Sequence, residues 1–281
     1  MTHQGVEEAE WSLAGESGVG LLRARYVRQA FPRHTHECFV VCVDERGAHG
    51  SWYRGANVVV PERALTIVPP DTVHTGVMVP GQPWHYRAMY PAAALIDALA
   101  AELGLPAGST PSFRELSVDD PALTDLFLYA HMRSERSDDE LERESLVLSV
   151  LMAVIQRHAS EARRVNSDAH KIPGVARAME LMRSCYAHRL TLADLARAAD
   201  TGRYAIIRAF QRHIGMSPYA YLTQIRVERA MALLTAGARV AAVARRVGFA
   251  DQSHLTRKFK RFVGITPAAF ARGVRRETTG R

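Results

Sequence analysis

The chain has 281 residues, with 36 Lys and Arg against 29 Asp and Glu and a formal net charge of +7. Its three cysteines are too few for a disulfide framework, and no apolar run approaches the roughly 18 residues of a membrane span. These features disfavour secreted disulfide-rich and membrane proteins. We therefore expect a cytoplasmic protein long enough for two domains, each with its own core.

The positive charge is concentrated at one end of the chain. Residues 171–281 hold 21 Lys and Arg against 6 Asp and Glu, whereas residues 1–170 hold 15 against 23. Such a surplus predicts a polyanionic partner and salt-sensitive binding through counterion release. A membrane-binding module is also basic, but no helical pattern sets basic residues opposite large apolar ones. Double-stranded DNA is therefore the favoured partner.

The N-terminal half predicts a β domain. Residues 1–19 are rich in Glu, Gly and Ser, and we expect a flexible leader there. Seven short runs rich in apolar, β-branched and aromatic residues then alternate with Pro, Gly and charged turns: Leu21–Val27, Cys38–Val43, Ser51–Tyr53, Ala56–Val60, Leu65–Val68, Thr75–Val79 and His85–Tyr90. Strands at this spacing predict a small antiparallel barrel or sandwich.

Two histidine-containing patches fall among these strands. Pro32-Arg-His34-Thr-His36-Glu and Pro69-Pro-Asp71-Thr-Val-His74 resemble the two sequence motifs of cupin barrels, over about residues 21–90. In a metal-binding cupin, such histidines and a Glu shortly after the first pair hold a divalent metal. Here Val40 and Val41 occupy the Glu positions, so we predict no metal and no cofactor. Elemental analysis of the purified protein should find no stoichiometric metal.

Two other interpretations of the barrel stay open. Cys38 and Cys42 share strand parity with His34 and His36, which allows a His/Cys metal or redox site, although buried thiols are the simpler interpretation. A small-molecule effector is favoured, with a lining that offers aromatic walls and polar anchors: His34, His36, Trp52, His74, Tyr86 and Arg87. Trp52 and Tyr86 suit the barrel core equally well, and Arg87 suits an ion pair.

Helices are predicted next. Ala92–Leu103 is followed by Pro121–Arg133 and Glu140–His158. The last has an apolar stripe of Leu141, Leu148, Leu151, Met152 and Ile155, which fits packing on the barrel and also pairing between subunits. We favour a homodimer. Residues 20–158 then form the effector-binding domain, and residues 159–172, without an apolar repeat, form the linker.

After an opening helix at Val175–Tyr186, one pattern occurs twice. Thr191–Ala199 and Arg203–Gly215 are two helices joined by a turn at 200–202; Val240–Val247 and Asp251–Gly264 are joined by a turn at 248–250. Both copies end alike, in Ile214-Gly-Met-Ser-Pro218 and Val263-Gly-Ile-Thr-Pro267, where Gly ends a helix and Ser or Thr with Pro begins the next. The pattern predicts two helix-turn-helix (HTH) units, joined by a helix that runs from Pro218 to about Ala236.

Helical periodicity predicts which side chains of the second helices face outward. They are Tyr204, Ile207, Arg208 and Gln211 in the first unit, and Gln252, Ser253, Thr256, Arg257 and Lys260 in the second. Arg, Gln and Ser pair with base edges or phosphates, and Ile207 suits a thymine methyl. Ordinary solvated faces of a helical bundle are the alternative. The repeat and the local charge favour DNA binding.

The run Val247-Gly-Phe-Ala-Asp-Gln-Ser-His-Leu-Thr-Arg-Lys-Phe-Lys-Arg-Phe-Val-Gly-Ile-Thr-Pro267 closely resembles the C-terminal signature of the AraC/XylS family of bacterial transcription regulators. The similarity covers about residues 173–272. It implies DNA contacts at Tyr204, Ile207 and Arg208 in the first unit and at Gln252, Ser253, His254 and Arg257 in the second. Periodicity places His254 at the edge of the outward face. Ile207 stands where the family often has a polar residue.

The sequence thus predicts an α+β protein of two domains: a cupin-like barrel with flanking helices, and an all-α tandem HTH domain at 173–272 followed by a basic tail at 273–281. The expected function is non-enzymatic, sequence-specific regulation of transcription at a promoter or operator under a small-molecule effector. The resemblance also implies contact with RNA polymerase. A metal-dependent cupin enzyme fused to a DNA-binding domain, or a nucleoid-type binder with little sequence preference, are the alternatives.

Overall fold

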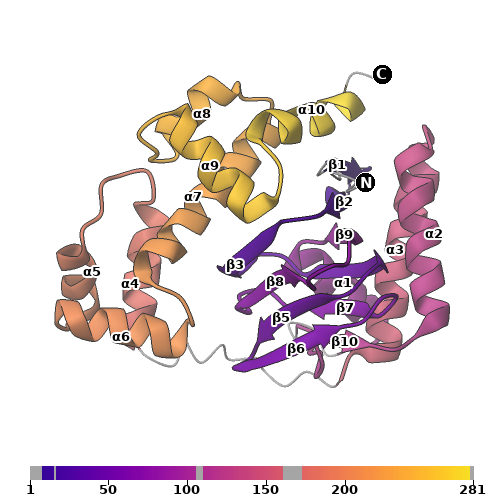
Figure 1. Cartoon of the computed structure of the whole chain (residues 1–281), viewed down its shortest axis with the longest axis horizontal. Coiled ribbons are helices and arrows are strands. Elements are labelled where there is room, and N and C mark those ends of the chain that lie inside the picture. The colour runs from indigo at the N-terminus through magenta and orange to yellow at the C-terminus, as the bar shows by residue number, and fades with distance from the viewer. Residues whose placement is uncertain (1–7, 16, 106–109, 161–172, 279–281) are drawn as a thin grey trace. The chain divides into compact units, whose positions relative to one another are not determined.

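The computed structural model describes residues 8–15, 17–105, 110–160 and 173–278, and the chain divides into two compact units (Figure 1). The first unit contains most of the strands and helices α1–α3. The second contains helices α4–α10 together with the short segments Phe31–Thr35 and Val73–Thr75. The predicted linker residues 161–172 lie outside the described residues.

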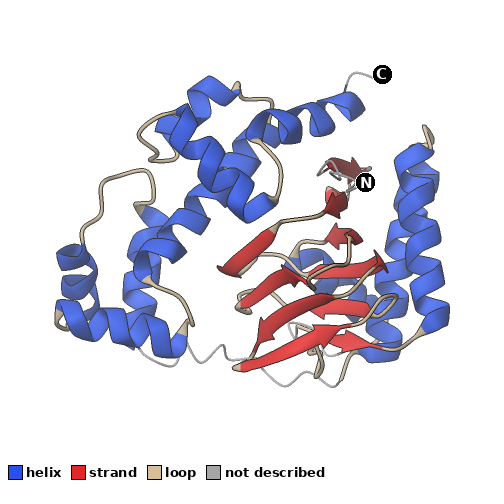
Figure 2. Cartoon of the chain, in the orientation of Figure 1, coloured by secondary structure: helices blue, strands red, loops and turns tan. Residues whose placement is uncertain are grey.

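The strands form two sheets (Figure 2). In chain order they are β1 (Glu8–Ala14), β2 (Val19–Tyr26), β3 (Ala30–His34), β4 (Val40–Arg46), β5 (His49–Tyr53), β6 (Ala56–Val60), β7 (Leu65–Val68), β8 (His74–Met78), β9 (Trp84–Tyr90) and β10 (Ser117–Val118). An antiparallel six-stranded sheet has the order β1-β2-β9-β4-β7-β10, and a four-stranded sheet has the order β3-β8-β5-β6. The predicted antiparallel β fold is confirmed.

The first strand occupies part of the segment for which a flexible leader was predicted. β1 pairs along its whole length with β2, and Trp11 on β1 is only 6% exposed. Composition misled the prediction here, because an edge strand that pairs on one side tolerates the Glu and Ser residues that also mark disordered segments. Residues 1–7 lie outside the described residues.

Three helices cover one face of the six-stranded sheet: α1 (Ala93–Glu102), α2 (Pro121–Arg136) and α3 (Glu140–His158). Alternate strand residues such as Val41, Val43 and Met89 pack against Phe127 and Leu151 of the helices. The side chains of Asp120 and Asp139 cap α2 and α3, because their carboxylates accept hydrogen bonds from backbone N–H groups at the N-termini of these helices. Packing therefore fixes which face of each strand points away from the helices.

The second unit, over residues 173–278, consists of helices and connecting loops (Figure 2). Its helices are α4 (Pro173–Ser184), α5 (Leu192–Ala199), α6 (Arg203–His213), α7 (Pro218–Thr235), α8 (Val240–Arg246), α9 (Gln252–Val263) and α10 (Pro267–Thr278). The predicted tandem HTH arrangement is present, with α7 between the two HTH units. α10 continues through much of the segment predicted as a basic tail.

The two HTH units have separate apolar centres. Val175, Leu195, Phe210 and Ile225 belong to one buried cluster formed by α4–α7. Val243, Val247, Leu255, Phe259 and Phe270 are also buried, but they do not belong to that cluster. The connecting helix α7 contributes buried residues along its whole length, from Tyr221 to Leu234. The two HTH units are therefore distinct modules that share the helix α7.

Candidate functional site

The first HTH unit, α5 and α6, is built around a turn at Asp200. Thr191 and Asp194 form a capping box at the start of α5, and Asp200 ends this helix in the left-handed conformation with φ of 54°. Gly202 precedes α6 but provides no side-chain cap. The backbone N–H groups at the start of α6 therefore lack the side-chain acceptor that Asp, Ser or Thr would supply.

The second HTH unit, α8 and α9, has a more strongly specified turn. Gly248 has φ of 86°, in the region that favours glycine. Asp251 caps α9, because its carboxylate accepts a 2.7 Å hydrogen bond from the backbone N–H of His254. Gly264 ends α9 in the left-handed conformation with φ of 86°. Both ends of α9 are thus fixed by local chemistry.

The outward faces of α6 and α9 carry the residues predicted from periodicity. On α6, Arg208 and Gln211 are exposed and Ile207 is half-buried, whereas Ile206 and Phe210 face the core. On α9, Gln252, Ser253, Arg257 and Lys260 are exposed, as is Arg261, and Thr256 is half-buried. The side chain of Tyr204 lies outside the described residues. Each helix therefore presents a polar face opposite its buried stripe.

His254 lies at the edge of the outward face of α9. Its side chain is half-buried, and its ring meets the ring of Phe249 edge-on with centroids 5.1 Å apart. This placement agrees with the edge position that periodicity predicts. It leaves only part of the imidazole on the surface.

The three predicted histidines come together. Ligand-capable atoms of His34, His36 and His74 all lie within 4.8 Å of one another. His34 Nδ1 lies 2.7 Å from Pro32 O, and burial lowers the pKa of His34 to about 4, so its imidazole is neutral at pH 7. Imidazole nitrogens suit a divalent transition metal, but this group of three includes no carboxylate.

The predicted strand parity of the cysteines does not hold. β3 ends at His34 and β4 begins at Val40, so His36 and Cys38 lie between strands and do not extend the alternation to Cys42. Cys42 is buried, and desolvation raises the pKa of its thiol. Its thiol is therefore protonated at neutral pH, which disfavours reaction at this sulfur.

A buried cluster that the sequence analysis missed lies on the face of the six-stranded sheet opposite the helices. Asp44 accepts hydrogen bonds from His49 Nδ1 at 2.6 Å and from Trp84 Nε1 at 2.8 Å. The Trp84 ring stacks with the rings of His49 and Tyr86, with centroids 4.8 Å apart in each case. The sequence contains little signal of this cluster, because Asp44 follows the apolar run 40–43 and begins the charged run 44–46, which is typical of an exposed strand end.

Two of the predicted effector residues lie elsewhere. Trp52 is half-buried and alternates along β5 with the buried His49, Ser51 and Tyr53, so it points to the other face of that strand. Arg87 follows Tyr86 on β9 and points toward the helices. The six predicted residues therefore do not share one face.

Arg87 is the centre of a polar cluster between the sheet and α2. Its guanidinium donates to Glu45 at 2.7 Å, to Glu135 at 2.6 Å and to His131 Nδ1 at 3.1 Å. The other nitrogen of His131 lies 3.3 Å from Ala88 O, to which it donates. Burial, with the adjacent Arg87 charge, lowers the pKa of His131 to about 3, so this histidine is neutral in the folded protein.

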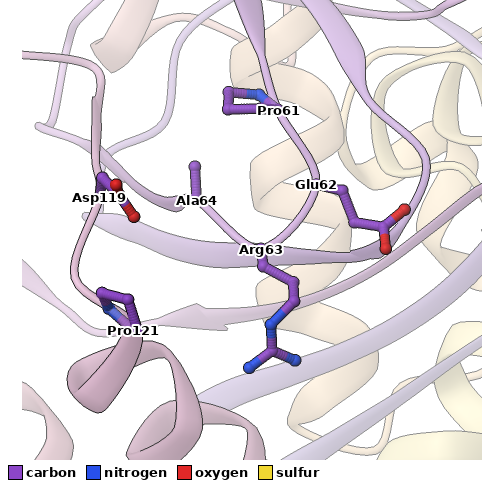
Figure 3. Close-up of a pocket in the computed structure, with 6 residues that line it drawn as sticks. All are labelled: Pro61, Glu62, Arg63, Ala64, Asp119 and Pro121. Atoms are coloured by element: carbon purple, nitrogen blue, oxygen red, sulfur yellow. The ribbon is translucent and has the colours of Figure 1, made fainter.

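A surface hollow lies where the turn after β6 meets the start of α2 (Figure 3). It is lined by Pro61, Glu62, Arg63, Ala64, Asp119 and Pro121. Glu62 already accepts a hydrogen bond from Gly47 N, and Arg63 is paired with Asp125. Two of the three charged residues in the lining are therefore engaged within the protein, and we assign the hollow no ligand.

Comparison with known proteins identifies both halves of the chain. Residues 17–151 match the model of the AraC-like ligand binding domain, and residues 195–273 match a helix-turn-helix domain. The chain belongs to the AraC family of transcriptional regulators. It is thus an AraC-type regulator, with a ligand-binding domain and an HTH DNA-binding domain. Within the described residues, no helix combines the length and apolar character needed to cross a membrane.

Relatives of this AraC-family chain are also named as regulators. An uncharacterized HTH-type transcriptional regulator of Bacillus subtilis, YbfI, is 27% identical over 83% of this chain and 84% of its own length. A putative AraC-like transcription regulator of Streptomyces antibioticus is 31% identical over 63% of this chain and 57% of its own. ToxT of Vibrio cholerae has a similar fold, with a TM-score of 0.58 at 10% identity over 90% of this chain and 97% of its own.

Proposed function

We propose that α6 and α9 are the two recognition helices of this regulator and that they read successive segments of the major groove. The observation that carries this proposal is the pair of outward polar faces, with Arg208 and Gln211 on one helix and Gln252, Ser253 and Arg257 on the other. Tyr204, Ile207, His254 and Lys260 complete the proposed contacts. Arg257 is the best candidate for bidentate pairing with a guanine.

Selection of DNA fragments by the purified protein tests this proposal. The pool should contain random sequence and the region upstream of the protein's own gene, at near-physiological salt. We expect a defined site with two recognition blocks about one helical turn, or ~34 Å, apart. Salt-sensitive binding without a motif would contradict sequence-specific readout and would support a nucleoid-type binder.

We propose that the effector binds in the first unit, on the side of the six-stranded sheet that faces away from the helices. The buried aromatic rings of Tyr86 and Trp84 lie on that side, together with the hydrogen-bonded polar pair Asp44 and His49. Such a mixture suits a small organic ligand. His34, His36, His74, Trp52 and Arg87 stay predictions from the sequence alone, and the segments that hold His34 and His74 belong to the second unit. A wild-type ToxT structure contains an unsaturated fatty acid, and fatty acids therefore belong in the effector screen.

The effector screen needs a control for non-specific stabilisation. Compounds are ranked by the rise in thermal unfolding midpoint of the full chain, since a ligand that binds only the folded state stabilises it. A compound that binds in the first unit should lose its effect in Tyr86→Ala and keep it in Arg257→Ala. Equal stabilisation of both variants would contradict the proposed site.

We propose that the regulator acts as a homodimer and contacts RNA polymerase. On α3, Leu141 is 74% exposed, and Leu148 and Met152 are half-buried, whereas Leu151 and Ile155 belong to the core. The exposed part of the predicted stripe supports pairing between subunits. Sedimentation of Leu141→Glu and the wild-type chain tests this, and an unchanged monomer–dimer equilibrium would contradict it. Transcription from the selected promoter with purified polymerase tests the second partner.

The alternative function is a metal-dependent enzyme, and the three imidazoles of His34, His36 and His74 support it. Our prediction remains that the purified protein holds no stoichiometric metal. Elemental analysis near one equivalent, lost in His36→Ala, would overturn that prediction. Turnover that depended on the same histidines would then favour the enzyme.

A further inference from the structure

The point at which α7 passes between the two HTH units is marked by one polar residue. Ile225 belongs to the apolar cluster of the first HTH unit, whereas Val227 is buried outside that cluster. Arg226 lies between them and is half-buried. Because the apolar cluster of α4–α7 includes no residue of α8 or α9, it does not by itself fix the orientation of the second HTH unit.

Arg226 binds the loop that follows α4. Its Nε donates to Tyr186 O at 2.7 Å, and Nη2 donates to His188 O at 2.9 Å. Among the described residues no carboxylate pairs with it, so its charge is directed at two backbone carbonyl groups. The planar guanidinium has the geometry for two such bonds at once, which a lysine ammonium reproduces poorly.

The turn of the second HTH unit packs against the same place. A Cβ atom added to Gly248 would lie 2.8 Å from Arg226 Nε, 2.8 Å from Tyr186 O and 3.0 Å from Ala187 O. Real Cβ atoms do not approach backbone oxygens so closely. The loop after α4, the guanidinium on α7 and the α8–α9 turn therefore meet at one junction, with room only for glycine.

We infer that Arg226 and Gly248 are positioning residues that fix the orientation of α9 relative to α6. This inference rests on the proposed function of these two helices in DNA recognition. Neither residue needs to touch DNA, because their effect is on how well both recognition helices fit the duplex together. They would set the preferred spacing between the two DNA blocks.

The experiment uses the full chain and duplexes made from the selected site. One duplex carries both blocks, two carry a single block with the other scrambled, and a further series changes the spacing by one base pair at a time. The variants are Arg226→Met, Arg226→Lys and Gly248→Ala. Arg272→Met is the control, because Arg272 is an exposed arginine on α10 and its loss removes the same charge.

We expect Arg226→Met to bind the two-block duplex about tenfold more weakly than Arg272→Met, the size of effect that two charged hydrogen bonds allow. Single-block duplexes should bind both variants equally, and the spacing preference of Arg226→Met and Gly248→Ala should broaden. Arg226→Lys should show the same broadening at unchanged net charge.

Two outcomes would overturn the inference. One is an Arg226→Met variant that matches Arg272→Met on every duplex. The other is equal weakening on single-block and two-block duplexes together with a lower unfolding midpoint, which would mean that Arg226 only stabilises the fold. Failure of the proposed function itself would look different, because the wild-type chain would then select no two-block site.

Discussion

Arg87 and Arg257 are the same residue type in opposite surroundings. Arg87, on β9 of the first unit, is 5% exposed and binds Glu45, Glu135 and His131. Arg257, on α9 of the second unit, is exposed, and its side chain has no hydrogen bond or ion pair within the described part of the chain. The first arginine has its partners inside the protein, and the second has its donors available to an external partner.

The difference extends to the surroundings of each arginine. Around Arg87, Glu45 and Glu135 compensate the buried charge, which suits a group whose role is to hold α2 on the sheet. Near Arg257 on α9, Lys258, Lys260 and Arg261 add further positive charge. A folded protein tolerates such a cluster on its surface, where water and salt screen it, and DNA then replaces the screening ions. Compensated buried charge thus stabilises the first unit, and exposed positive charge suits the second unit for binding DNA.

The largest effect should come from Arg87→Met. Removing the guanidinium leaves two carboxylates and a neutral imidazole without their common donor, so we expect the free energy of unfolding to fall by about 3 kcal/mol. Urea denaturation of the full chain measures this. The matched control is Arg63→Met, because the Arg63–Asp125 pair is exposed and should contribute less than about 1 kcal/mol. Equal losses in the two variants would contradict the contrast between buried and exposed charge.

The buried histidine gives the first unit a pH dependence. His131 has a pKa of about 3 in the folded protein and 6.5 as its ordinary value, so the unfolded chain binds more protons between these values. Stability is then present above pH 6.5 and is lost as the pH falls toward 3. Between pH 7 and 5, we expect the wild type to lose about 2 kcal/mol more than His131→Gln, whose amide does not titrate. Parallel urea titrations that gave the same pH dependence would exclude this role for His131.

Arg257→Ala should leave folding nearly unchanged and weaken DNA binding. We expect a loss of about 1–3 kcal/mol on the selected site, with relaxed preference at one base pair, if the guanidinium reads a base. Binding titrations against duplexes substituted at each position measure both effects. Lys260→Ala is the comparison, because a phosphate contact weakens all sequences alike and reduces the salt dependence. The same uniform loss in Arg257→Ala would reassign that residue to the DNA backbone.

The smallest effect concerns the caps of the recognition helices. Asp251→Ala should cost about 1 kcal/mol of stability, because α9 loses the acceptor for His254 N. Asp251→Asn should retain most of that stability. In the first HTH unit, Gly202→Asp should instead raise the free energy of unfolding by a few tenths of a kcal/mol, since α6 has no side-chain cap. Chemical denaturation of the three variants checks the order, which would be wrong if Gly202→Asp destabilised the chain.

The helical half was predictable in more detail than the sheet half. The apolar periodicity, the capping residues and the glycines at helix ends located α5–α9 and the outward faces of α6 and α9. These three signals are local properties of a helix. In the sheet unit, β6 and β7 were predicted with their observed bounds, but β1, β3 and β10 were missed. Short strands have weak local signals, and pairing with a neighbour decides whether they form.

The candidate sites divide in the same way. The outward placement of the polar residues on α6 and α9 could be predicted, since a single helix determines which side chains face away from its core. The partners of Arg87, and the cluster of Asp44, His49 and Trp84, could not be predicted, because Glu135 lies 48 residues from Arg87 and Trp84 lies 40 residues from Asp44. The sequence suggested an effector role for Arg87 but contained no local sign that Glu45 and Glu135 would bind its guanidinium.

The sequence by itself determined the charge asymmetry, the repeated HTH pattern and the polar faces of α6 and α9. These follow from the order of residues along the chain, and a helix converts that order directly into a surface. Only the tertiary structure decided which face of each strand is buried, which charges neutralise one another and how Arg226 meets Gly248. Such pairings depend on strand register and helix packing, where a shift of one residue exchanges the two faces of a strand.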